Sequence, residues 1–160
     1  MVKETGHEFI YRNEVMKFRN IALRGPWTSG GIEFNFGVIG HTPATATPVD
    51  YVIRENPDGS VSCWVGGMDL PSRTHWRVEI RLRPDRAYFE TNVLWYNPTP
   101  LEQPYYNWMT AAAFAQDDLE MSIPGDAYLE HSGNEMPWPL DEQGRYLPLY
   151  RNNTFESHKS

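Results

Sequence analysis

Cysteine pairs, long apolar runs and an excess of positive charge are all missing from this 160-residue sequence. The single Cys63 excludes an internal disulfide framework, and no Cys/His cluster has the spacing of a structural zinc site. No apolar stretch approaches the roughly 18 residues that a membrane-spanning helix needs, and the first residues contain no apolar core of an export signal. We therefore expect no metal, no cofactor and no membrane partner, while localisation stays open between cytoplasm and periplasm.

The charge balance argues against one further class of partner. The chain has 14 Lys and Arg residues against 21 Asp and Glu residues, which gives a formal net charge of -7. Binding to a phosphate backbone depends on clustered positive charge, whereas the basic residues here are scattered among acidic ones. We therefore expect no nucleic-acid partner.

Aromatic residues, by contrast, make up 14% of the chain, and 13 Pro and 12 Gly interrupt it at short intervals. This composition favours short strands joined by many turns. A chain of this length fits one domain, which buries roughly 70% of its unfolded surface. We predict an all-β fold with antiparallel sheets, organised as a single β-sandwich domain over residues 1–160.

Two hairpins are predicted from turn residues and alternation. Residues 50–54 and 61–65 flank a turn in which Pro57 suits the first central position of a type I turn and Gly59 suits a left-handed conformation. The second hairpin joins residues 75–83 to residues 87–96. In its first strand an apolar row alternates with a charged row, which we expect to be a solvated face, with a polar groove as the alternative. The apolar row is Trp76, Val78, Ile80 and Leu82, and the charged row is His75, Arg77, Glu79, Arg81 and Arg83.

Shorter strands are expected elsewhere, and the segment around residues 105–114 is ambiguous because its alanines have helical propensity while its aromatic residues favour a strand. We interpret that segment as a strand, since its neighbours are strands. The remaining predicted strands are 8–11, 15–18, 32–36, 121–123 and 127–130, and residues 137–139 are expected to be a loop.

The strand over 32–36 carries the candidate site. Its apolar residues alternate with Glu33 and Asn35, so the carboxylate and the amide share one face. Ser29, Gly30 and Gly31 lead into the strand with little bulk, which allows a ligand or another backbone to approach closely. The alternative to a binding site is that Glu33 and Asn35 belong to a sheet face exposed to solvent.

Carbohydrate is the ligand class that this inventory suits, because aromatic rings pack on sugar C–H groups while carboxylates and amides bind hydroxyl groups. Acid or base catalysis on a sugar needs two titratable groups, and Glu33 is the candidate for one of them. No second group can be named from spacing. The alternative for each aromatic residue is that it packs in the core. The alternative for His41 is that it is a loop residue whose side chain bonds to backbone groups. The candidate substrate-binding residues are Trp27, Asn35, His41, Asn107 and Trp108.

A series of motifs carries a likeness to known proteins. The motifs are Phe9–Asn13, Gly25–Asn35, His41–Pro43, Pro48–Tyr51, Asp58–Ser60, Asn97–Pro100 and Asn107–Ala112. Together they resemble a bacterial domain family of unknown function that is often found next to tetratricopeptide repeats and is similar to the galactose-mutarotase-like supersandwich. The likeness spans nearly the whole chain.

The resemblance implies an antiparallel supersandwich whose concave face binds a carbohydrate, in a protein that processes glycans as a glycoside hydrolase or a sugar epimerase. Mutarotases use an acid His on a central strand, whereas Tyr105–Trp108 occupies that position here. A mutarotase reaction is therefore not assigned, and whether the domain is an enzyme stays open. A sugar-binding module and a structural or protein-interaction domain are the alternatives.

Length is a second departure from the family pattern. Supersandwiches run well over 200 residues, so we expect this chain to be an incomplete N-terminal part of that fold, truncated at the C-terminal end. Sheet edges left open in this way would be covered by further strands or by a second copy of the chain. We therefore also expect a homo-oligomer through exposed strand edges, and tetratricopeptide repeats in the longer protein.

Overall fold

A computed structural model of the chain describes residues 2–8, 10–12, 18–20, 26–28, 30–36, 47–104, 106–130 and 132–153, with the backbone alone at 18–20 and 26–28. Within these residues the fold is all-β and every paired strand is antiparallel, as predicted. The described part contains no α-helix, only a short 3-10 turn, η3, over Tyr150–Asn152. None of its helices has the length and apolar character to cross a membrane.

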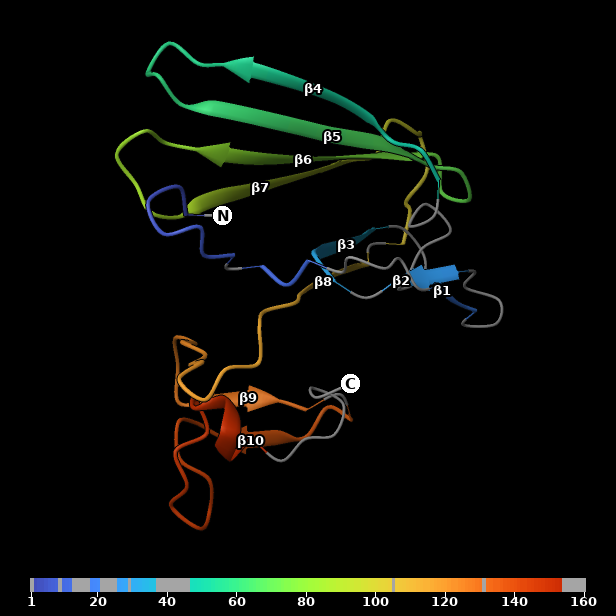
Figure 1. The fold of residues 1–160 in the computed structure, drawn as a ribbon. Coiled ribbons are helices and arrows are strands. Elements are labelled where there is room, and N and C mark those ends of the chain that lie inside the picture. The colour runs from blue at the N-terminus through green and yellow to red at the C-terminus, as the bar shows by residue number, and fades with distance from the viewer. Residues whose placement is uncertain are drawn as a thin grey trace. The chain divides into compact units, whose positions relative to one another are not determined.

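The strands form four separate ladders (Figure 1). The chain divides into two compact units, Met1–Ala113 and Phe114–Ser160. The strands are β1 (Phe18–Asn20), β2 (Pro26–Thr28), β3 (Ile32–Phe36), β4 (Asp50–Glu55), β5 (Val61–Asp69), β6 (Thr74–Leu82), β7 (Phe89–Tyr96), β8 (Asn107–Ala111), β9 (Ala127–Leu129) and β10 (Glu135–Pro137).

The largest sheet of the first unit has the order β4-β5-β6-β7, so consecutive strands are neighbours. Both predicted hairpins are present in it. In the β4–β5 turn, Gly59 N–H donates to the Asn56 carbonyl at 2.9 Å, and Gly59 has the left-handed φ of 79° that the sequence pattern anticipates. Glycine is required for another reason at Gly66, where an added Cβ would lie 2.9 Å from the Trp76 carbonyl oxygen.

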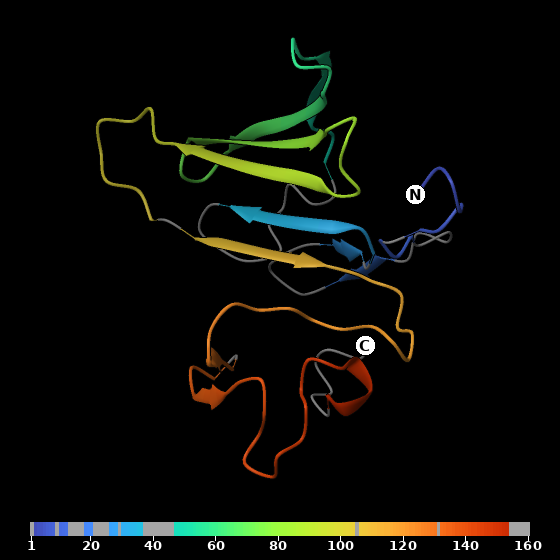
Figure 2. The same ribbon diagram turned by 90° about the vertical axis from the view of Figure 1, so that its left-hand side faces the viewer.

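The core of the first unit lies between this sheet and the β3–β8 ladder. Val78 of β6 is fully buried, and Phe36 of β3 is almost so. The Phe36 and Trp76 rings stack with their centroids 5.5 Å apart, so the apolar face of β3 meets the apolar face of β6. Figure 2 shows β3 and β8 running side by side next to the larger sheet. The predicted apolar rows of the strands over 32–36 and 75–83 therefore both face the core, although Leu82, at the end of its row, is exposed.

A buried polar network closes one end of the larger sheet. Asp69 accepts a hydrogen bond from the Ser72 hydroxyl at 2.5 Å, and the Ser72 and Thr74 hydroxyl oxygens lie 2.7 Å apart. The Trp95 indole N–H donates to the Thr74 hydroxyl at 3.1 Å, which links β6 to β7. No fully buried side-chain N or O atom of Asp69, Ser72, Thr74 or Trp95 lacks a hydrogen-bond partner, as is usual for buried polar groups.

The second unit is small and contains one two-stranded ladder, β9–β10. Its described buried apolar residues are Trp138 and Leu147, and the Tyr128 ring meets the Trp138 ring edge-on at 6.1 Å. The prediction of a loop at 137–139 was wrong at Pro137, which ends β10. A proline is tolerated there because each strand of a two-stranded ladder has an open side, where no N–H is needed for pairing.

Two other predicted strands are not formed. Residues 121–123 have no ladder partner, although Glu120 and Leu149 make an isolated bridge beside them. The described residues of 8–11 are not a strand, but the backbone of Tyr11 bonds to that of Gly31 and of Ala112 at 2.9 Å each. Of the strand predicted over 15–18, only Phe18 is described, and it begins β1.

Candidate functional site

The β3–β8 ladder places the predicted site residues on defined faces. The strands are antiparallel, with Glu33 opposite Thr110, Asn35 opposite Trp108 and Phe36 opposite Asn107. Residues that face each other across a ladder point to the same side of the sheet, and sides alternate along each strand. One side therefore carries Glu33, Asn35, Trp108 and Thr110, and we call it the β3–β8 polar face.

On this face the carboxylate has a hydroxyl beside it. The Thr110 hydroxyl donates a 3.3 Å hydrogen bond to Glu33 Oε2. Glu33 is half-buried and Thr110 is exposed, so both are accessible to a molecule from outside. Asn35 is fully buried and lies beneath the surface rather than on it.

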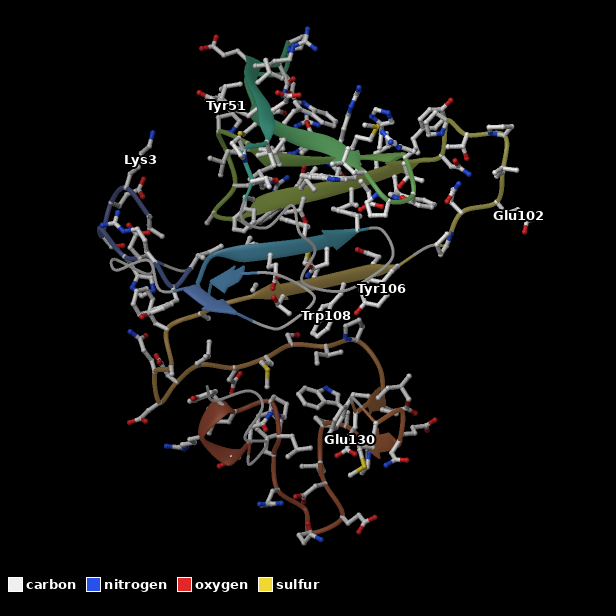
Figure 3. The ribbon with its side chains drawn as sticks, turned by 90° about the vertical axis from the view of Figure 1, so that its right-hand side faces the viewer. Lys3, Tyr51, Glu102, Tyr106, Trp108 and Glu130 are labelled. Atoms are coloured by element: carbon white, nitrogen blue, oxygen red, sulfur yellow. The ribbon has the colours of Figure 1, made fainter. Side chains whose placement is uncertain are left out.

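Aromatic rings extend the polar face along β8. The Tyr106 and Trp108 rings have centroids 6.4 Å apart and planes tilted by 60°, and both side chains are half-buried. Figure 3 shows the two labelled rings on the same side of the strand. Tyr106 stands two residues before Trp108, so the strand period accounts for this shared side. The polar face thus combines a carboxylate, a hydroxyl and two rings.

The other predicted site residues are placed differently. Asn107 is exposed but lies opposite Phe36, and so belongs to the side of the ladder that carries the apolar row of β3. Trp27 is in β2, where the backbone alone is described, and His41 lies outside the described residues. The structure therefore brings together three of the predicted residues, Glu33, Asn35 and Trp108, and separates Asn107 from them.

A second polar cluster lies on the larger sheet and was missed by the sequence interpretation. Glu79 belongs to the charged row that we expected to be solvated, yet it is only 8% exposed. Its Oε1 accepts a 2.6 Å hydrogen bond from the Ser62 hydroxyl, and its Oε2 accepts a 2.8 Å bond from the Asn92 amide. Strand register explains this cluster. Glu79 lies opposite Asn92 of β7 on one side and opposite Trp64 of β5 on the other, and Ser62 is two residues before Trp64 on the same side of the sheet. These bonds tie three strands together.

Electrostatics stabilise the charged form of this carboxylate. The Ser62 hydrogen bond lowers the pKa of Glu79 from its usual value of 4.5, and Asn92 and the Arg81 charge act in the same direction against the effect of burial. The Ser62 hydroxyl in turn accepts a 2.7 Å bond from Asn56 of the hairpin turn. The expectation of a wholly solvated face was therefore wrong at Glu79.

The hairpin turn holds a second stabilised carboxylate, Asp58. The Ser60 hydroxyl and backbone N–H both donate to it, and the Arg81 guanidinium forms an ion pair with it at 2.6 Å. These contacts, with Ser60 contributing most, lower the pKa of Asp58 from 3.8 to about 2. Ser60 belongs to the same turn as Asp58 and Arg81 to strand β6, so these contacts join the hairpin turn to β6 as a structural network does.

Among the described residues, no group of three or more His, Cys, Asp or Glu side chains is arranged to hold a metal ion. The side chains of the β3–β8 polar face are suited to hydrogen bonding and ring packing.

The fold and the face define an all-β domain with antiparallel sheets and a carboxylate beside aromatic rings. The chain belongs to the family described as a domain of unknown function (DUF5107), whose model matches residues 1–160. The predicted resemblance to a domain family of unknown function is thereby confirmed, and the match spans both units. No solved structure matches the chain.

Proposed function

We propose that this chain is a carbohydrate-binding domain of a glycan-processing protein and that the β3–β8 polar face is its binding site. The observation that carries the proposal is the combination on one face of the Glu33 carboxylate, 3.3 Å from the Thr110 hydroxyl, with the paired rings of Tyr106 and Trp108. Sugars present C–H groups that pack on rings and hydroxyls that bond to carboxylates.

Each residue has a distinct role in this proposal. Glu33 accepts hydrogen bonds from sugar hydroxyls, beside the bond that it accepts from Thr110. Trp108 supplies the stacking surface, since its side chain is half-buried and retains an accessible part. Asn35 points to the same side but is fully buried, so its role in this proposal is to support the neighbouring side chains of the face. Trp27 and His41 remain proposed contacts on sequence grounds alone.

Whether the site also cleaves or isomerises the sugar depends on a second titratable group. Glycosidases and mutarotases need an acid and a base on either side of the reacting carbon. Glu33 is the one carboxylate on the described part of the β3–β8 polar face. The likeness of the motifs to mutarotase-like supersandwiches, and to domains that stand next to tetratricopeptide repeats, supports a glycan-processing protein as the setting.

The test is a panel of oligosaccharides, with binding and hydrolysis read on the same samples. We expect at least one sugar to bind the wild-type chain, and Glu33→Ala to weaken that binding about tenfold by removing hydrogen bonds to a charged acceptor. Glu33→Gln separates the two roles, because a binder keeps most of its affinity while a catalyst loses turnover. The absence of binding across the panel, or equal affinity in Glu33→Ala and wild type, contradicts the proposal.

A protein-interaction domain is the second candidate, and one specific observation favours it. The outermost strand of the larger sheet, β4, is exposed at all six of its residues.

A further inference from the structure

Among the described strands, β4 is at an open edge of its sheet, and it carries exposed apolar side chains. It pairs with β5 on one side only, and no other described strand pairs with its outer side. Tyr51 is 72% exposed and Ile53 is 64% exposed. Natural edge strands are commonly protected by proline, charged side chains or a bulge; this strand has no proline and no bulge, and its charged residues are near its ends. Its sequence, Asp50–Glu55, is therefore a template for pairing with another strand.

The hairpin determines which backbone groups the open edge presents. The Asn56 N–H donates to the Ser60 carbonyl at 2.8 Å, so Asn56 points its backbone groups toward β5. Backbone direction alternates along an antiparallel strand, which also turns Val52 and Arg54 toward β5. Tyr51, Ile53 and Glu55 consequently direct their N–H and C=O groups outward.

These outward groups and the side chains of β4 are complementary to a second copy of the same strand. An antiparallel pairing centred on Val52 places Tyr51 opposite Ile53 of the second copy, where both residues present free-edge backbone groups and form a hydrogen-bonded pair. The same pairing places Asp50 opposite Arg54 of the second copy. By symmetry this charge pair occurs twice, and opposite charges directly across a ladder are stabilising.

Other registers lack this match. A pairing centred on Ile53 places Tyr51 opposite Glu55 and Val52 opposite Arg54 of the second copy. A pairing centred on Tyr51 places Asp50 opposite Val52. Neither arrangement pairs opposite charges. The other edge of the sheet, β7, is not self-complementary in charge, because Glu90 is its only charged residue and already forms an ion pair with Arg83 at 3.2 Å.

We propose that two copies of this chain pair through β4, antiparallel about a two-fold axis at Val52, and so join their four-stranded sheets into one continuous sheet. The pairing continues the apolar side of each sheet across the axis, because Tyr51 and Ile53 share a side with Val65 and Cys63. The inference is independent of carbohydrate binding, since it uses none of the residues of the β3–β8 polar face.

The first experiment measures the mass of the full 160-residue chain by sedimentation over a range of concentrations. We expect a dimer whose dissociation constant rises about tenfold in Arg54→Asp, because two like-charge pairs replace two attractive ones. Adding Asp50→Arg to that variant restores both pairs in reversed order and returns the dimer. Arg86→Asp, an exposed change in the β6–β7 turn, is the matched charge control and leaves the dimer unchanged.

The second experiment tests the register by cross-linking in a Cys63→Ser background. At the proposed axis the two Val52 residues form a non-hydrogen-bonded pair, whose Cα atoms are about 4.5 Å apart and within disulfide range. Val52→Cys therefore forms a disulfide-linked dimer under mild oxidation, whereas Arg54→Cys does not, because its symmetry mate lies four residues away along the partner strand. A monomer at all concentrations, a dimer insensitive to Arg54→Asp, or cross-linking by Arg54→Cys in place of Val52→Cys overturns the proposal.

Discussion

Phe36 of β3 and Trp76 of β6 stack with ring planes only 12° apart and centroids 5.5 Å apart. The two residues belong to different ladders, so this contact joins the β3–β8 pair to the four-stranded sheet. The contact also determines to which side of the β3–β8 ladder the candidate site residues point. Because Phe36 faces Trp76, the alternation along β3 directs Glu33 and Asn35 away from the larger sheet.

Removing the Phe36 ring is expected to destabilise the first unit severely. Phe36 is almost fully buried, so Phe36→Ala leaves a cavity and should lower the free energy of unfolding by about 3–5 kcal/mol. Urea denaturation followed by tryptophan fluorescence measures this change. Tyr88→Ala is the control, because Tyr88 is exposed and its loss should cost about 0.5 kcal/mol or less. Equal effects of the two changes would contradict the proposed core.

Glu79→Gln is expected to destabilise the sheet although it is nearly isosteric. The Ser62 hydroxyl and the Asn92 amide both donate to the carboxylate, whereas a glutamine offers one acceptor oxygen and turns a second donor toward them. The lost charged hydrogen bonds should lower the free energy of unfolding by about 1–3 kcal/mol, as measured by urea denaturation. Glu102→Gln, at an exposed position, should have little effect. A Glu79→Gln variant as stable as the wild type would show that the cluster does not hold the strands together.

Acid should destabilise the chain through Asp58 and Glu79. The folded-state pKa of Asp58 is about 2, below its ordinary value of 3.8, so its contribution to stability is fully present above pH 3.8 and is lost as the pH falls toward 2. The lowered pKa of Glu79 has the same sign, with its contribution lost on acidification below 4.5.

Asp58→Asn isolates the first of these effects. Unfolding free energies of the variant and the wild type should differ at pH 6 and converge as the pH approaches 2, because protonation removes the same charge in the wild type. Urea denaturation at a series of pH values measures the difference. A difference that stays constant from pH 6 to pH 2 would contradict the stabilising role of the ionised Asp58.

Local chemistry accounts for the parts of the fold that the sequence predicted well. The β4–β5 hairpin follows from Pro57 and Gly59, whose backbone preferences determine the turn without help from the rest of the chain. The sides of β3 and β6 follow from strict alternation of apolar and polar residues. Such signals depend on neighbours in sequence, and they placed Phe36, Trp76 and Val78 in the core.

Register between distant strands accounts for what the sequence could not predict. Nothing local indicates that β3 pairs with β8, or that Glu33 lies opposite Thr110 on a strand far along the chain. The separation of Asn107 from Trp108 is a different case, because adjacent residues of one strand point to opposite sides, and this follows once residues 105–114 are interpreted as a strand. The burial of Glu79, like the pairing of β3 with β8, depends on register, through the positions of Ser62 and Asn92 on neighbouring strands. A search for Ser, Asn and Glu on adjacent predicted strands would have indicated this cluster.

Sugar binding by the β3–β8 polar face is tested most directly by comparing Trp108→Ala with Met109→Ala in a calorimetric titration with the sugar that the panel identifies. The two residues are neighbours on β8 and point to opposite sides of it, so the pair separates the role of the face from that of the strand. The proposed site predicts that Trp108→Ala weakens binding about tenfold while Met109→Ala leaves the affinity unchanged. Unchanged affinity in Trp108→Ala, or an equal loss in both variants, would contradict it.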